Sequence, residues 1–208
     1  MVALDTSKHT IIFIVDTSGS MYGQKIEAVN AAVAECAEVI RNNNRDNSLQ
    51  VGYVTFDEEW GNLVVKNEIG TVGFKIKANA DGFYRLTKYQ CLYEGVENCL
   101  VGFNNSKTKL CLLLITDGKP SDSGKYIDVL ERVKNMDAFR NSERLVALVD
   151  NEVNGMDNDI LEFVGYKADK VVKLNDVVSA LLKVSFLSGF NSGSNSANAD
   201  HYNTIFGD

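Results

Sequence analysis

The chain has 208 residues, of which 45% are hydrophobic and 24% are charged, and its formal net charge is −7. This composition is typical of a soluble globular domain large enough to bury its own core. The negative charge disfavours nucleic acid or an anionic membrane as a partner, and no apolar run approaches the roughly 20 residues that span a bilayer. Because residues 1–8 serve as a polar lead-in, we expect no secretory signal and a cytoplasmic location.

Strand-like and helix-like patterns alternate along the chain. A short run rich in Ile and Val ends at Val15, which predicts a strand buried on both faces of a sheet. In chain order we predict a strand at 10–15, a helix at 23–42, strands at 49–56 and 60–65, an extended piece at 69–76, a helix at 92–103, a strand at 109–116, a helix at 125–136, a strand at 144–149, a helix at 157–164, a strand at 170–174 and a helix at 177–187.

This alternation predicts an α/β fold with helices on both faces of a central, mostly parallel sheet. The link at 57–59 is too short for a crossover helix, so strands 49–56 and 60–65 are expected to form an antiparallel hairpin at the sheet edge. We place the domain at 1–187. Residues 188–208 have the Ser, Gly and Asn content of a flexible linker, and form either a disordered tail or a docking peptide that supports self-association.

The cysteines give no sign of a zinc site. None of them forms a C-x-x-C pair, and the chain has only two histidines, both near its ends. Two of the cysteines fall on apolar positions of predicted elements, so buried free thiols in a reducing cytoplasm are the preferred interpretation. The cysteines are Cys36, Cys91, Cys99 and Cys111.

Polar oxygen-bearing side chains follow two of the buried strands. Asp16, Ser18 and Ser20 come directly after the first strand, and Asp117 follows the strand at 109–116. In open α/β sheets ligands bind at the carboxyl edge of the strands, and hard oxygens suit a hard cation. We therefore predict a metal site there. The alternative is that Asp16 caps the following helix and Ser18-Gly19-Ser20 is a turn.

The Asp16-x-Ser18-x-Ser20 loop and the later Thr116-Asp117-Gly118 resemble a von Willebrand factor A (vWA) domain, over roughly residues 8–187. The resemblance implies a Rossmann-like three-layer fold with a metal-ion-dependent adhesion site, or MIDAS. By position, Ser18 and Ser20 would bind the cation directly, and Asp16 and Asp117 directly or through water. Mg²⁺ is the preferred cation, with Mn²⁺ or Ca²⁺ as alternatives, and an acidic group of a partner would complete the shell.

The second loop of the resemblance departs from the family pattern, which has a threonine shortly before the helix. Counting back from Leu92 leads to Gln90, whose amide oxygen is also a hard ligand. Thr87 reaching in from a longer loop is one alternative, and a site with weakened or no metal affinity is another. We expect a retained but atypical site.

The stretch at 113–122 further resembles the bacterial TerY-like vWA proteins of tellurium resistance and stress response. That resemblance implies a small cytoplasmic scaffold near protein kinases and phosphatases. We therefore expect binding rather than catalysis, through an Asp or Glu of a protein partner, with partner contacts from Met21, Tyr22, Lys119 and Asp122. The alternatives are a metal-dependent phosphatase or hydrolase, with Asp122 or Glu58 as loose candidates for its base, and an adhesion module of a larger secreted protein.

Overall fold

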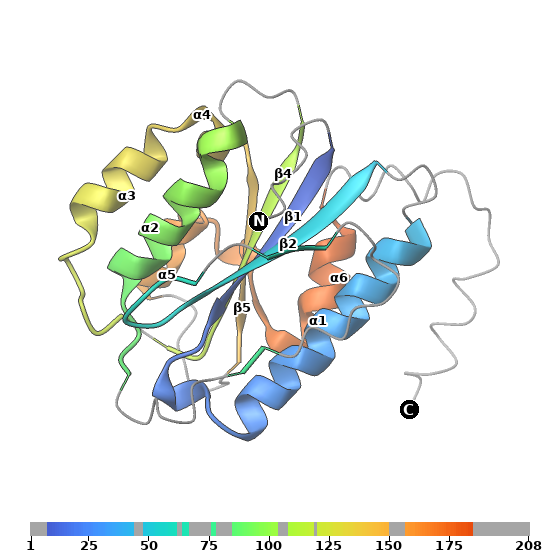
Figure 1. Cartoon of the computed structure of the whole chain (residues 1–208), viewed down its shortest axis with the longest axis horizontal. Coiled ribbons are helices and arrows are strands. Elements are labelled where there is room, and N and C mark those ends of the chain that lie inside the picture. Colours follow the sequence, from blue (N-terminus) through green and yellow to red (C-terminus); the bar gives the residue numbers. More distant parts are fainter. Residues whose placement is uncertain are drawn as a thin grey trace.

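The computed structural model describes residues 8–43, 48–61, 64–66, 76–77, 85–103, 108–118, 120–149 and 157–184, in which strands and helices alternate (Figure 1). The strands are β1 (His9–Asp16), β2 (Leu49–Phe56), β3 (Val64–Lys66), β4 (Leu110–Thr116), β5 (Glu143–Leu148) and β6 (Val171–Lys173). The α-helices are α1 (Gln24–Asn43), α2 (Tyr89–Leu100), α3 (Ile127–Lys134), α4 (Asp137–Arg140), α5 (Asn158–Phe163) and α6 (Val177–Leu182). Turns of 3₁₀-helix occur at Gly19–Met21, Val101–Phe103, Ala168–Lys170 and Leu174–Asp176.

The strands form one sheet in the order β3-β2-β1-β4-β5-β6. The neighbouring strands from β2 to β6 pair in parallel, whereas β3 pairs with β2 in the antiparallel sense over three residue pairs. The chain passes from β1 to β2 on one side and later returns to β4 on the other side. The carboxyl ends of β1 and β4 therefore lie next to each other, at the kind of position where open α/β sheets bind ligands.

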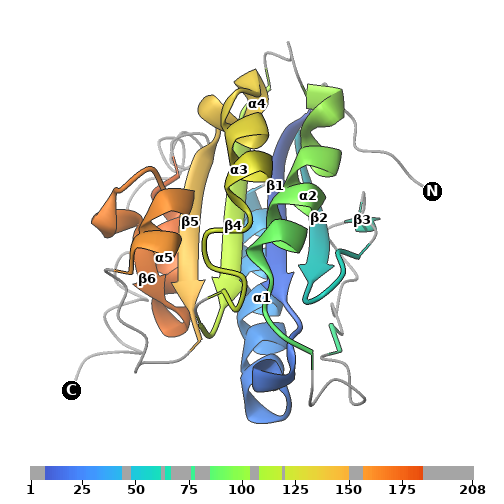
Figure 2. The ribbon, with the colours of Figure 1, turned by 90° about the vertical axis from the view of Figure 1, so that its left-hand side faces the viewer.

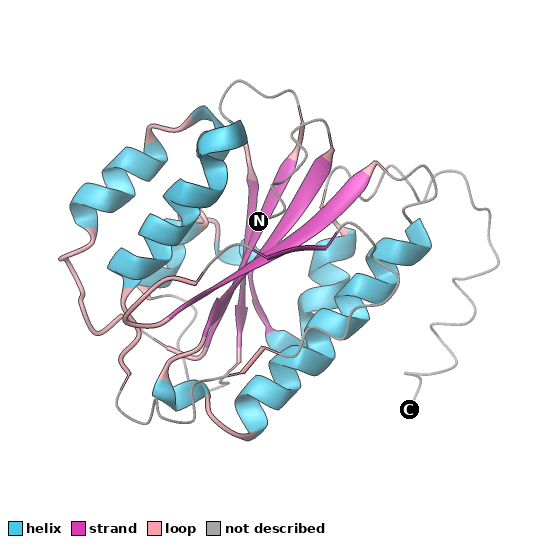
Figure 3. Cartoon of the chain, viewed as in Figure 1, coloured by secondary structure: helices cyan, strands magenta, loops and turns pink. Residues whose placement is uncertain are grey.

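Alternate residues of β1 supply two separate cores, because successive side chains of a strand point to opposite faces. Ile11, Phe13 and Val15 pack with α1 and α6, and Ile12 and Ile14 pack with α2 and α3. Figures 2 and 3 show the helices on both faces of the sheet, with α2, α3 and α5 together on one of them. The predicted flanked, parallel α/β sheet is confirmed. Among the described residues no helix combines the length and apolar composition that crossing a bilayer requires.

Several predicted boundaries shift where loops make tertiary contacts. α2 begins three residues before the predicted start at Leu92, and its last predicted turn is 3₁₀. α3 begins at Ile127 rather than Lys125, after a turn at 121–126 in which Gly124 adopts a positive φ of 80°. The short helix α4 follows α3 and was not predicted.

Other predictions fall wholly or partly outside the described residues. The described part of the edge strand is β3 at Val64–Lys66, and Trp60 of the predicted range 60–65 forms an isolated antiparallel bridge with Phe56. The extended piece at 69–76 lies outside the described part except for Ile76. α6 ends at Leu182, and the tail at 188–208 with its proposed self-association is not described.

Candidate metal centre

The first loop begins with a fully buried carboxylate at the end of β1. The backbone N–H of Ser18 donates to Asp16 Oδ1 at 2.9 Å, so the chain folds back over the aspartate immediately after the strand. The Thr17 hydroxyl donates to the Phe56 carbonyl oxygen at 3.2 Å and thereby ties the loop to the end of β2. Ser18 is buried and Ser20 is exposed, so the loop extends from the protein interior to the surface.

The third loop follows β4 and meets the first loop directly. The Thr116 hydroxyl donates to Asp16 Oδ2 at 2.7 Å, and the Ser20 hydroxyl donates to Asp117 Oδ1 at 2.9 Å. Ser18 Oγ and Ser20 Oγ lie 3.1 Å apart. The parallel pairing of β1 with β4 therefore brings together the residues predicted from the first and third loops, as expected for neighbouring central strands.

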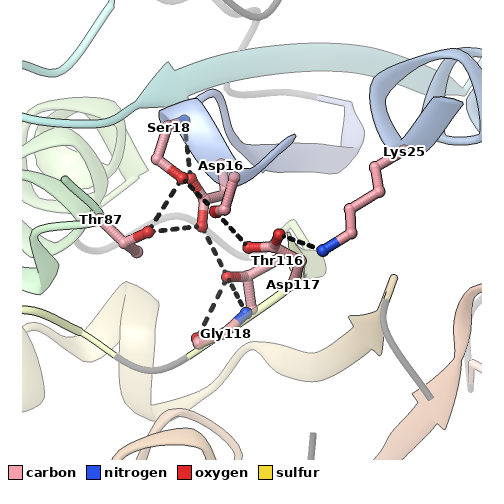
Figure 4. Close-up of polar contacts among 8 residues, drawn as sticks. Asp16, Ser18, Lys25, Thr87, Thr116, Asp117 and Gly118 are labelled. Carbon is pink, nitrogen blue, oxygen red and sulfur yellow. Dashed lines mark hydrogen bonds and ion pairs between the residues drawn. The ribbon is translucent and has the colours of Figure 1, made fainter. Parts of the chain in front are cut away.

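The second loop brings Thr87 into this cluster, whereas Gln90, the first choice from the sequence, lies outside it. Thr87 Oγ1 lies 3.2 Å from Asp16 Oδ2 and 3.0 Å from Ser18 Oγ (Figure 4). Gln90 is exposed, and its side-chain amide donates to Glu94 one helical turn further on, at 3.0 Å. Because α2 begins at Tyr89, Gln90 already lies on the helix surface, and the threonine of the preceding extended segment enters the cluster.

Backbone contacts from two other loops hold Thr87 in place. Its carbonyl oxygen accepts hydrogen bonds from both the backbone N–H and the hydroxyl of Ser121, each at 2.8 Å. Two residues earlier, the carbonyl oxygen of Arg85 accepts the N–H of Gly19 at 3.0 Å, and the Arg85 guanidinium pairs with buried Asp57 at 3.0 Å. The second loop is therefore fixed to both the first and the third loop.

Two of the residues expected to contact a partner have structural roles instead. Met21 is completely buried in the core next to α1, because the 3₁₀ turn directs it inward. Asp122 is also buried, and its two carboxylate oxygens accept the N–H groups of Tyr89 and Gln90 at 2.9 and 3.0 Å. It therefore caps the start of α2. Tyr22 is 51% exposed beside the site, and Lys119 lies outside the described residues.

The charges in the cluster are unequally compensated. Burial raises the pKa of the Asp16 carboxyl to about 6; hydrogen bonds from Ser18 and Thr116 oppose this shift, and the nearby Asp117 adds to it. The Asp117 side chain, which is 3% exposed, forms an ion pair with Lys25, whose Nζ lies 2.7 Å from Oδ2. Figure 4 shows Lys25 reaching the cluster from α1. A positive group thus already contacts one of the two buried carboxylates.

The donor set fits a hard cation. The hydroxyls of Ser18, Ser20 and Thr87 and the carboxylates of Asp16 and Asp117 form one network, with contacts of 2.9 to 3.2 Å. Neutral and anionic oxygens of this kind suit Mg²⁺ or Mn²⁺. In the described segments no group of three or more His, Cys, Asp or Glu side chains comes together to hold a metal, so the site depends on its hydroxyls. That these residues bind a metal stays a prediction.

A comparison with protein families identifies the domain. Residues 10–176 match the model of the von Willebrand factor type A domain. The chain belongs to the vWA family. Domains of this family commonly mediate protein–protein interaction or adhesion. A search of curated proteins found no match.

Solved structures share the vWA fold at low sequence identity. The pilus adhesin SpaC from Lactobacillus rhamnosus GG, in an open conformation, superposes with a TM-score of 0.60 at 14% identity, over 91% of this chain and 30% of that one. Proximal thread matrix protein 1 from the mussel byssus superposes with a TM-score of 0.58 at 16% identity, over 87% of this chain and 48% of that one. An aerotolerance-related membrane protein from Bacteroides fragilis superposes with a TM-score of 0.54 at 12% identity, over 88% of this chain and 99% of that one. The chain thus spans less than half of the first two relatives.

Sequence reasoning did not assign two polar residues of this vWA site. Thr116 donates to Asp16, and its position directly before Asp117 was the available signal. Lys25 lies four residues after Met21, on the first turn of α1, where a long side chain can reach back over the loop. Its partner Asp117 lies 92 residues further along the chain, so local spacing could not indicate this contact.

Proposed function

We propose that this vWA domain, residues 1–187, is a metal-dependent protein-binding module. A divalent cation, preferably Mg²⁺, would bind Ser18, Ser20 and Thr87 directly and Asp16 and Asp117 directly or through water. A Glu or Asp of a protein partner would provide the last ligand. The observation that carries this proposal is the convergence of hydroxyls and carboxylates from three loops at the carboxyl edge of β1 and β4.

The charge of the chain supports a bridging role for the cation. With a net charge of −7, the domain would repel an acidic partner. A divalent cation between the protein's oxygens and the partner's carboxylate converts that repulsion into an oriented contact. The exposed Ser20 and Tyr22 leave the outer side of the cluster open to such a partner.

The proposal also includes a cellular role for this domain. The resemblance of residues 113–122 to TerY-like proteins supports a scaffold role in a bacterial tellurium-resistance or stress response, with a kinase or phosphatase as partner. The four cysteines are buried and free, which supports a reducing compartment such as the cytoplasm. The adhesin among the structural neighbours supports the alternative of an adhesion module, which would use the same metal-bridged contact.

A hydrolase at the same edge has less support. Both oxygens of Asp122 are used by α2, and the Glu58 carboxylate lies 3.5 Å from Lys88 Nζ. These two carboxylates were the candidates for a general base; Asp122 is buried in its contacts, and Glu58 pairs with Lys88.

Calorimetric titration with Mg²⁺ and Mn²⁺ tests the metal site. We expect the wild-type chain to bind one ion, and Asp16→Asn and Thr87→Ala to weaken binding by at least about tenfold. Gln90→Ala is the matched control and should bind like wild type, because its side chain faces Glu94. Equal affinity of Asp16→Asn and wild type, or a loss in Gln90→Ala alone, would contradict the proposed ligand set.

The partner contact can be tested with acetate as a model carboxylate. Acetate should perturb the electron paramagnetic resonance spectrum of Mn²⁺ bound to the chain, whereas acetamide should not. After Asp117→Asn the acetate effect should be lost together with the bound Mn²⁺. A Mn²⁺ spectrum that is insensitive to acetate would argue against a coordination position for a partner's acid.

A further inference from the structure

Lys25 places a positive charge within the cluster that would hold the metal. It is the second residue of α1, and its ammonium lies 2.7 Å from Asp117 Oδ2 (Figure 4). The Lys25 side chain is 35% exposed, so it approaches the site from the solvent side, whereas that of Asp117 is 3% exposed. The ion pair therefore joins a solvent-accessible ammonium to a buried carboxylate.

The contact uses the carboxylate that a cation would need. Asp117 Oδ1 accepts the Ser20 hydroxyl at 2.9 Å, and Lys25 takes the other oxygen. Asp16, the second buried carboxylate, is held by Thr87, Thr116 and the Ser18 N–H, none of which carries a charge. Buried carboxylates are costly without a counter-charge, and Lys25 supplies one to this pair.

We propose that Lys25 is an intramolecular competitor of the metal ion. This inference rests on the proposed metal site. Without metal, the ammonium neutralises Asp117 and stabilises the assembled loops. A divalent cation at the cluster would repel the ammonium and draw the same carboxylate, so the ion pair has to open when the metal binds. Lys25 thereby lowers the metal affinity and lets the site keep its shape at low metal concentration.

Lys88 offers a matched control for this effect. Its side chain is 38% exposed, nearly the same as that of Lys25, and it adjoins Thr87 of the second loop. Its ammonium pairs with Glu58 at 3.5 Å rather than with a carboxylate of the cluster. Lys88→Met removes the same charge from the same edge of the sheet and leaves the ion pair with Asp117 intact.

The test is Mn²⁺ titration by calorimetry of the full chain as wild type, Lys25→Met and Lys88→Met. We expect Lys25→Met to bind Mn²⁺ about tenfold more tightly than wild type. A change of this size is expected on removal of an ion pair that is partly buried. Lys88→Met should stay within about twofold of wild type. In chelator, Lys25→Met should melt at a lower temperature than Lys88→Met, and added Mn²⁺ should raise its melting temperature by more.

The outcomes separate this inference from the metal site itself. If wild type binds Mn²⁺ and Lys25→Met binds no more tightly than Lys88→Met, the competitor role is overturned and the metal site stands. If only Lys25→Met binds, the competitor role is supported and the native site is closed by its own lysine. If neither binds, both proposals fail. Should Lys25→Met not fold without metal, Lys25→Gln, which keeps a hydrogen-bonding head without the charge, is measured in its place.

Discussion

Asp122→Ala should weaken the fold by loosening the start of α2. The Asp122 carboxylate is buried and accepts the N–H groups of Tyr89 and Gln90 at 2.9 and 3.0 Å. A lost helix cap costs about 1 kcal/mol, and a hydrogen bond to a charged group contributes roughly 1.5–3 kcal/mol. With both bonds on one carboxylate, we expect unfolding to become easier by about 3 kcal/mol for Asp122→Ala and by about 1 kcal/mol for Asp122→Asn, which keeps a neutral acceptor.

Urea denaturation followed by circular dichroism measures the free energy of unfolding. The m-value should be the same in the variants and the wild type, so that a shift in midpoint reports stability. Asp128→Ala is the control: it removes an exposed acid from the first turn of α3, and its loss should cost less than about 0.5 kcal/mol. Amide exchange at Tyr89 and Gln90 should accelerate in Asp122→Ala alone. A loss of less than about 1 kcal/mol, or unchanged exchange at these two amides, would refute the capping role.

Three further predictions concern buried groups. Because burial raises the pKa of Asp16 to about 6, above its ordinary value near 3.8, its contribution to metal-free stability is lost as pH rises from about 4 to 6. The unfolding free energy of wild type relative to Asp16→Asn should therefore fall by roughly 3 kcal/mol between pH 4 and 7, and a flat difference in denaturation curves would contradict this. Within the described residues the buried hydroxyl of Tyr93 has no hydrogen-bond partner, whereas the hydroxyl of Tyr126 donates to Asp159. Tyr93→Phe should therefore leave the melting temperature unchanged or raise it. Tyr126→Phe should lower the free energy of unfolding by about 1–2 kcal/mol. Burial raises the pKa of the four thiols, those of Cys36, Cys91, Cys99 and Cys111. Their alkylation by iodoacetamide should therefore be slow in the native chain and fast in urea. Rapid labelling of any of them in the native chain, measured by mass spectrometry, would contradict this.

Local pattern was sufficient for the parallel sheet and for two of the three site loops. The runs 11–15 of β1 and 110–115 of β4 are apolar, because both faces of each strand are covered, and this is visible without knowledge of the neighbours. Asp16, Ser18, Ser20 and Asp117 follow these strands directly. Once the two strands are neighbours, their carboxyl ends have to meet, so the sequence alone could place these four residues together.

Only the tertiary structure decided the second loop and the charge of the site. Counting back from Leu92 to Gln90 assumed where the helix begins, but that start is set by Asp122, a carboxylate more than thirty residues away. Other contacts between distant segments place Thr87 beside Ser18 and Lys25 beside Asp117. Sequence spacing predicts which residues are neighbours on one helix or strand. These contacts instead depend on loops from different strands that meet at one edge of the sheet.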